Sequence, residues 1–189
     1  MSNEFKDWIK EQSPIEKAIV NKYPFLVSMN ARDLDGNVRS EVELPLMVLE
    51  IPDGWLKLFY QMCQDIKDYA VQNKCLDNIY FAQVKEKFGR LCCYMIYKNH
   101  VCDNYIEEII HNYSEVSEFI CADCGRVADV WHNKLGLTLC SHCLKEYSQK
   151  DYFKNTRVIP SDAFAQSFSK HPLIWKDYFN NKETDNAEM

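Results

Sequence analysis

The sequence predicts an α+β fold: a small antiparallel hairpin or sheet packed on helices, with a compact zinc-ribbon-like module built on four cysteines. Three observations predict it. Two stretches, 53–73 and 102–120, repeat apolar residues at helical spacing. The stretch between them, 78–97, alternates side chains as strands do. Two Cys-x-x-Cys pairs then follow the second helical stretch directly.

The first predicted helix begins at Asp53-Gly54-Trp55 and runs to about Asn73. Its apolar residues recur at steps of three and four, which places them on one face and suits that face to a core. The second predicted helix, 102–120, has the same period and runs straight into the first cysteine pair. The apolar residues of the first helix are Trp55, Phe59, Met62, Ile66 and Tyr69.

A β-hairpin is predicted over 78–97, with its turn in the charged link 85–90, which contains the glycine that a turn needs. The link is basic around Phe88, so it is a candidate contact for phosphate or for an acidic partner. We favour the plainer interpretation, a charged turn with Phe88 folded into the core. The candidate contact residues are Lys85, Lys87 and Arg90.

The cysteine pairs have the spacing of a metal site. They are separated by 15 residues, and each pair can grip one tetrahedral ion if a tight turn lies between its two thiolates. Gly125 suits such a turn, since glycine tolerates positive φ. The tandem pattern predicts bound Zn²⁺ in preference to disulfides or free thiols. The predicted ligands are Cys121, Cys124, Cys140 and Cys143.

Four thiolates leave no open coordination position, so the zinc is expected to be structural. His132 and His142 lie within or beside the module. Either is an alternative ligand, but four cysteines already saturate a tetrahedral site, and we expect both histidines to be neighbours of the site instead. We picture a first knuckle, a short hairpin, and a second pair at the start of a helix.

Composition bounds the compartment and the class of partner. The net charge is −6, from 22 basic and 28 acidic residues, which argues mildly against general nucleic-acid binding. No run approaches the ~18 apolar residues of a membrane span, and the charged N-terminus predicts no secretory signal. We therefore expect a cytoplasmic protein with reduced thiols. Most of the other cysteines are expected to be small buried hydrophobes; they are Cys63, Cys75, Cys92, Cys93 and Cys102.

Three parts are predicted: an α+β domain over 1–120, the zinc-knuckle module over 121–150, and a C-terminal helical extension over 151–189 with a frayed tail. Two short helices are expected in this extension, over 163–168 and from Pro172.

The block Gln83-Val84-Lys85-Glu86-Lys87-Phe88-Gly89-Arg90-Leu91 is similar to one in a family of uncharacterised bacteriophage and prophage proteins. Gly54-Trp55, the Cys-x-x-Cys-Gly at 121–125 and the Leu-Cys-x-x-Cys at 139–143 complete the shared pattern. The resemblance covers about half the chain. Cys92-Cys93 and Val130-Trp131 depart from it, where the family has arginine with an aromatic and Gly-Trp. It implies a phage origin and supplies no activity.

These observations predict a non-enzymatic phage protein that binds a host or phage protein in the host bacterial cytosol, an inhibitor of a bacterial defence system among the options. The alternative is a nucleic-acid-binding zinc ribbon. A less favoured hypothesis is an HNH-like nuclease that uses Asp129, His132 and Asn133. The spacing between the cysteine pairs is too short to hold the ββα-metal hairpin of such nucleases. A zinc deaminase is excluded, because its His-x-Glu motif is missing. No membrane partner is expected, and the sequence does not indicate an oligomeric state.

Overall fold

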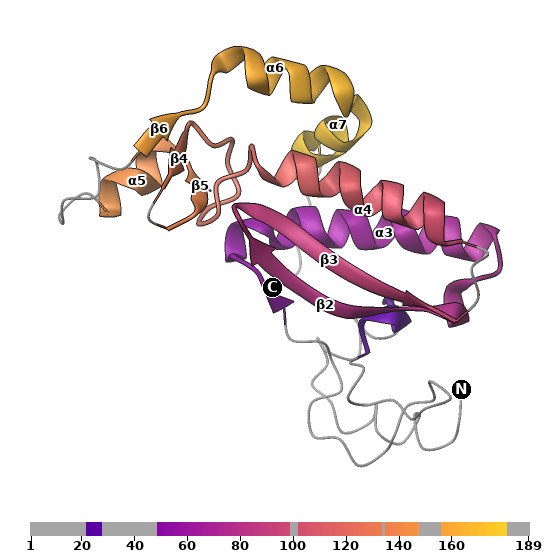
Figure 1. The fold of residues 1–189 in the computed structure, drawn as a ribbon. Coiled ribbons are helices and arrows are strands. Elements are labelled where there is room, and N and C mark those ends of the chain that lie inside the picture. Colours follow the sequence, from indigo (N-terminus) through magenta and orange to yellow (C-terminus); the bar gives the residue numbers. More distant parts are fainter. Residues whose placement is uncertain (1–21, 28–48, 99–101, 134, 148–155, 181–189) are drawn as a thin grey trace. The chain divides into compact units, whose positions relative to one another are not determined.

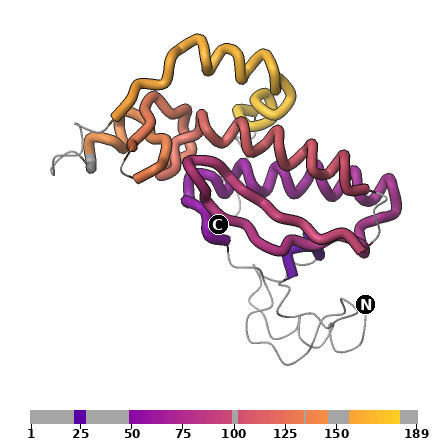
Figure 2. The backbone as a smooth tube through the Cα atoms, viewed as in Figure 1, coloured from indigo at the N-terminus to yellow at the C-terminus, as the bar shows by residue number. Residues whose placement is uncertain are grey.

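The computed structural model (Figure 1) describes residues 22–27, 49–98, 102–133, 135–147 and 156–180. It is a mixture of helices and two small sheets, which confirms the predicted α+β class. The trace in Figure 2 follows the same residues by colour. No helix in these ranges is long and apolar enough to cross a membrane.

The described residues divide into two units. The two long helices and the hairpin each contribute residues to both units, and the four cysteines lie in the second. The first unit comprises 22–27, 49–50, 63–85, 93–98 and 102–107. The second comprises 51–62, 86–92, 108–133, 135–147 and 156–180.

The predicted hairpin is confirmed as strands β2 (Ile79–Lys87) and β3 (Arg90–Tyr97), joined by a two-residue turn. A two-residue strand, β1 (Leu49–Glu50), completes a sheet of order β1-β2-β3 and runs parallel to β2. Leu49 lies opposite Val84 in this register. The apolar stretch 42–51, broken by Pro45 and closed by Pro52, predicts an edge strand or an extended loop, and its part before residue 49 lies outside the described residues.

Both long helices are confirmed as α3 (Leu56–Gln72) and α4 (Asp103–Ser117). A single 3-10 turn, η3 (Asp53–Trp55), leads into α3. Helix α4 ends before the predicted Ile120, since the amides of Phe119 and Ile120 reach back three residues instead of four. The apolar faces are buried as their spacing predicts. Fully buried members are Phe59, Met62, Ile66, Ile106 and Val116.

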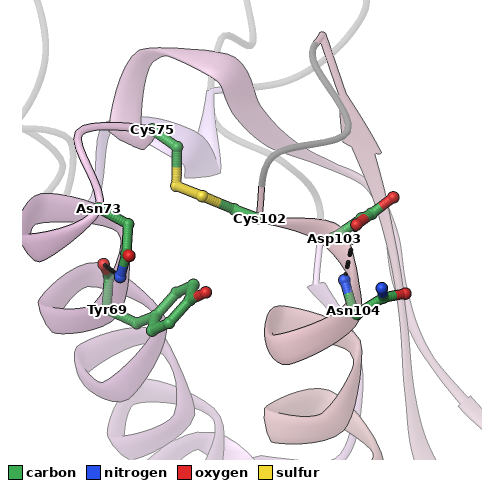
Figure 3. Close-up of a disulfide and its surroundings, with 6 residues drawn as sticks. All are labelled: Tyr69, Asn73, Cys75, Cys102, Asp103 and Asn104. Atoms are coloured by element: carbon green, nitrogen blue, oxygen red, sulfur yellow. Dashed lines mark hydrogen bonds between the residues drawn. A yellow bond between two sulfur atoms is a disulfide. The ribbon is translucent and has the colours of Figure 1, made fainter.

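A disulfide in the first unit joins Cys75, just after α3, to Cys102, just before α4 (Figure 3). Nearby, the rings of Tyr69 and Tyr105 stack with their centroids 4.3 Å apart. The pairing corrects the expectation that cysteines outside the metal module are reduced. The two cysteines are 27 residues apart, so no local pattern marks them as partners.

The second unit holds a sheet of three short strands, β4 (Val130–His132), β5 (Leu137–Leu139) and β6 (Thr156–Val158), in the order β5-β4-β6. Both pairings are antiparallel. Helix α5 (Ser141–Tyr147) follows β5. The hairpin and helix were predicted between and after the cysteine pairs. Strand β6 is not predicted, because its partner β4 lies far away in the chain and no turn between them marks the pairing.

Two C-terminal helices, α6 (Ser161–Lys170) and α7 (Pro172–Asn180), confirm the two short helices predicted in this part of the chain. Trp175 is fully buried, and its indole N–H donates to the Ser167 hydroxyl at 3.1 Å. The Trp175 ring packs edge to face on the Phe164 ring, with the ring centroids 5.1 Å apart, and stacks with the Phe179 ring, with the centroids 5.6 Å apart. This aromatic cluster explains how two short helices gain a core.

The Glu115 carboxylate on α4 binds two residues at the C-terminal end of α6, Lys170 and His171. The Lys170 Nζ lies 2.8 and 2.7 Å from the two carboxylate oxygens, and the buried His171 ring nitrogen lies 2.9 Å from one of them. Burial acts to raise the pKa of Glu115, but the hydrogen bonds from Lys170 and His171 outweigh it and lower the pKa. Glu115 therefore stabilises the fold in its charged form.

Replacing Glu115 with glutamine is expected to destabilise the protein near neutral pH and to have little effect in acid. Because the pKa of Glu115 is lower in the folded state, its carboxylate stabilises the fold fully at pH values above its pKa in the unfolded chain, about 4.3. This stabilisation is lost as the pH falls through the pKa of Glu115 in the folded state. Urea unfolding at a series of pH values checks this, with Glu108→Gln, an exposed change on the same helix, as control. A stability difference that does not change between pH 7 and pH 3 contradicts it.

Candidate metal centre

The structure brings the four predicted cysteines together. Their sulfur atoms all lie within 4.8 Å of one another, and those of Cys124 and Cys140 are 3.7 Å apart. Among the described residues this is the only group of three or more cysteine, histidine or acidic side chains with such a geometry. The four cysteines could therefore hold one metal ion.

The first knuckle is a tight turn that begins where the α4 segment ends. The Gly125 amide donates to the Cys121 carbonyl at 3.0 Å, and the Cys121 amide donates to the Arg126 carbonyl at 2.7 Å. Ile120 forms a β-bridge with Val127 across the base of the turn. Gly125 has φ +71°, which confirms why a glycine follows the first pair.

The second knuckle is set by a strand and a helix. Cys140 follows β5 directly, and Cys143 lies in the first turn of α5, where its amide points at the Cys140 sulfur at 3.5 Å. The Asp129 carboxylate accepts the Ser141 amide at 2.7 Å and so caps the start of that helix. The geometry agrees with the predicted pair at a helix start.

The sulfurs differ in their readiness to lose a proton. Burial acts to raise the pKa of Cys124, but hydrogen bonds from the Arg126 side chain and backbone lower it to about 6. The Arg126 Nε lies 3.3 Å from that sulfur. Burial raises the pKa of Cys121 to about 11, and burial with the neighbouring sulfurs raises that of Cys143. An arriving cation would therefore displace protons from the buried ligands.

Gly54 and Trp55 are hydrogen-bonded to the backbone of the first knuckle. The Gly54 amide donates to the Ala122 carbonyl at 2.8 Å, and the buried Trp55 indole N–H donates to the Ile120 carbonyl at 3.0 Å. From the sequence, Gly54 and Trp55 are predicted to begin a helix and belong to the pattern shared with the phage proteins. Their contact with the knuckle is not predicted, because that pattern shows only that they occur together with the cysteine motif and gives no spatial contact.

Gly54 has no room for a side chain, so Gly54→Ala is expected to be strongly destabilising. An added Cβ would lie 2.6 Å from the Ala122 carbonyl oxygen and 2.7 Å from the Gly125 nitrogen, both backbone atoms of the knuckle. Overpacking of this kind costs about 1–3 kcal/mol, and here it should also weaken metal affinity.

Urea unfolding and competition with a metal-binding dye measure both effects. Gly136→Ala is the matched control, because its Cβ meets open space and only its φ of +67° is unfavourable. That control should lose about 1–2 kcal/mol from its positive φ alone and keep its metal affinity, so metal affinity is the measurement that separates the two variants. A Gly54→Ala protein as stable as the parent would show that the knuckle tolerates displacement.

Helix α7 also braces the first knuckle. The Tyr178 hydroxyl donates to the Gly125 carbonyl at 2.6 Å, and the Lys57 Nζ lies 5.0 Å from the centre of the Tyr178 ring. A cavity of about 640 Å³ lies beside these residues and reaches Cys124 and Arg126. The exposed Cys124 sulfur is thus the ligand nearest to solvent.

The hairpin turn rests on the cysteine module. The backbone of Gly89 lies against the Trp131 ring so closely that a Cβ there would overlap it. The Gly89 amide donates to the Glu86 side chain at 2.7 Å. Phe88 is 80% exposed, which corrects the preferred expectation of a core position. The reason is the two-residue turn, in which Phe88 and Gly89 both have positive φ, +55° and +76°.

The three predicted basic contacts have different surroundings. Lys85 Nζ lies 5.6 Å from the centre of the Tyr94 ring, and Arg90 forms an ion pair with Glu118. Lys87 is exposed and lies beside Phe88, with its Nζ 5.5 Å from the ring centre. Of the three basic residues, Lys87 is therefore the one whose charge lies next to the exposed Phe88 ring.

The two histidines lie outside the four-sulfur cluster. His132 is buried, and its Nδ1 accepts the Leu135 amide at 3.1 Å, while His142 is exposed on α5. Of the three candidate nuclease residues, two therefore have structural roles: Asp129 caps the start of α5, and His132 accepts a backbone amide.

No protein-family profile matches the chain, and neither the curated proteins nor the solved structures contain a significant match. The fold and site define a class only: an α+β protein with a four-cysteine group that could bind a metal ion.

Proposed function

We propose that this chain is a non-catalytic, zinc-stabilised phage protein that binds a protein partner through the tip of its β2–β3 hairpin. The observation that carries the proposal is Phe88: a large apolar side chain, 80% exposed, on a turn that lies against the cysteine module.

Zinc is the ion that the ligand set favours. Four thiolates at about 2.3 Å from a tetrahedral zinc lie about 3.8 Å from one another, close to the 3.7 Å between the sulfurs of Cys124 and Cys140. Soft thiolate ligands select zinc over harder cations such as Mg²⁺ or Ca²⁺. Four protein ligands leave no position for water or substrate, so the ion would support the fold without doing chemistry.

Phe88 is held in a conformation that its side chain opposes. The left-handed region costs a residue with a Cβ about 1–2 kcal/mol, and hairpin turns of this kind usually place asparagine, aspartate or glycine there. A bulky aromatic residue that is both strained and exposed is a candidate for function, since strain is retained where it serves a site. Exposed aromatic anchors are typical of protein interfaces.

The setting of the proposal comes from the resemblance to phage proteins. It supports a place in the host bacterial cytosol and a partner of host or phage origin, with a component of a defence system as the case of greatest interest. In that compartment the Cys75–Cys102 disulfide would need a dedicated oxidant, because cytosolic thiols are ordinarily kept reduced. The acidic net charge of −6 agrees better with a protein partner than with general nucleic-acid binding.

Site-specific cross-linking tests the proposal. A photoreactive amino acid at position 88 in the full chain, expressed in infected cells, should capture one partner. The same group at Leu173, which is 72% exposed on α7, is the matched control and should not capture it. Capture of no protein at position 88, or of the same proteins at both positions, would contradict the proposal.

Phe88→Asn separates stability from binding. Asparagine tolerates positive φ, so this change should stabilise the fold by up to about 1 kcal/mol while weakening partner binding about thirtyfold, as loss of an interface anchor does. Urea unfolding and affinity measurement check the two effects. If Phe88→Asn keeps full affinity, the ring is not the anchor.

Lys87 beside an exposed ring favours one second candidate, a nucleic-acid contact in which Phe88 stacks on a base. Such binding would weaken steeply with salt, and Lys87→Ala would reduce the salt dependence by about one counterion. An affinity for single-stranded DNA or RNA that shows both behaviours would favour this alternative over a protein partner.

A further inference from the structure

We infer that Trp131 makes the Phe88 turn depend on the metal, so that the hairpin tip is in its binding conformation only when the four-cysteine site is loaded. The inference rests on the proposed function for its meaning. The coupling itself can be measured without any partner.

The first step is the contact between turn and module. Gly89 lies against the outer edge of the Trp131 ring, and a Cβ at Gly89 would also come within 2.9 Å of the Gly136 carbonyl oxygen. Trp131 lies on β4, and Gly136 lies in the connection from β4 to β5. Both residues belong to the segment between the two cysteine pairs.

The second step is what holds Trp131 in place. It pairs with Thr138 on β5 and with Arg157 on β6, in strands of three residues each. A sheet this small is marginal by itself. The chain enters it from the first knuckle, where the Ala122 amide donates to the Thr138 carbonyl at 2.9 Å, and β5 leads directly into Cys140.

The position of Trp131 therefore depends on joining the two knuckles. Structural metal sites of this type supply folding energy directly. Without the metal, the two knuckles are still linked by single hydrogen bonds, such as those from the Ala122 amide to the Thr138 carbonyl and from the Thr138 hydroxyl to the Ile120 carbonyl, but these hold a sheet of this size only marginally. The sheet then loosens and the ring under Gly89 is no longer fixed.

The third step is the turn itself. The Gly89 amide also donates a 2.7 Å hydrogen bond to the Glu86 side chain. Phe88 is strained at φ +55° and relaxes readily once the support is gone. Metal and partner would then favour each other's binding by equal factors.

Hydrogen exchange tests the inference on the full chain. The zinc-loaded protein is compared with the same protein after chelation, and the peptides covering 86–91 and 121–143 are followed. Exchange at 86–91 is expected to rise at least about tenfold on chelation, as it does at 121–143. The peptide 63–72 of α3, in the first unit, is the internal control and should change little.

Two variants locate the coupling. Trp131→Ala, with zinc still bound, should raise exchange at 86–91 to the chelated level, and chelation should add nothing more there. If Trp131→Ala loses zinc, Gly89→Ala is used in its place. The added Cβ at position 89 disturbs the same contact from the hairpin side and leaves the sequence of residues 121–143 intact.

Chelation that frees 121–143 but leaves 86–91 protected overturns the inference. The proposed function fails separately, if cross-linking at position 88 captures no partner while the exchange coupling is observed. Once a partner is captured, its affinity should also fall at least about tenfold on chelation. An affinity that chelation leaves unchanged would overturn the metal dependence of binding.

Discussion

Cys121→Ser is expected to abolish metal binding and to unfold the cysteine module. The sulfur of Cys121 is buried in the cluster, and a serine hydroxyl is a poor replacement for a thiolate ligand. Structural zinc contributes about 10–16 kcal/mol in small zinc-dependent domains. Loss of one ligand in four should therefore leave the strands β4 to β6 without a stable fold.

Metal analysis of the purified protein is the direct measurement. The parent should carry about one zinc per chain and Cys121→Ser none. Cys92→Ser, at a half-buried cysteine outside the cluster, is the matched control and should keep its zinc. The prediction fails if Cys121→Ser retains a full equivalent of zinc, or if the parent carries no metal.

The double change Cys75→Ser with Cys102→Ser is expected to lower stability by about 3.5 kcal/mol, the loop-closure estimate for a loop of this length. The bond closes a 27-residue separation between the ends of the two long helices. Its loss should act mainly by giving the unfolded chain more freedom.

Urea unfolding with and without a mild reductant, at saturating zinc, measures this effect. The reductant should bring the parent down to the level of the double variant and leave the variant unchanged. Equal stability of the parent in both conditions would show that the disulfide does not stabilise the fold.

Local patterns predicted much of this structure. The helices, the hairpin and both knuckles follow from spacings of two, three or four residues along the chain, and Gly125 was assigned its turn for the correct reason. Such signals are reliable because the interactions that cause them are themselves local.

The features that were missed depend on distant residues. Nothing in the sequence places Gly54 against Ala122, or Cys75 beside Cys102. Phe88 was expected in the core because it is large and apolar, yet its position in a two-residue turn exposes it. Turn geometry prevailed over hydrophobicity at that position, and only the pairing register of β2 and β3 reveals it.

The disulfide has a consequence for how the protein matures. One pair of cysteines must lose electrons to an oxidant, while four others must stay as thiolates to grip an ion. Bound metal would shield its ligands from thiol exchange, so loading the metal before oxidation favours correct pairing. Oxidation of the metal-free chain should therefore give more mispaired chains than oxidation of the loaded chain.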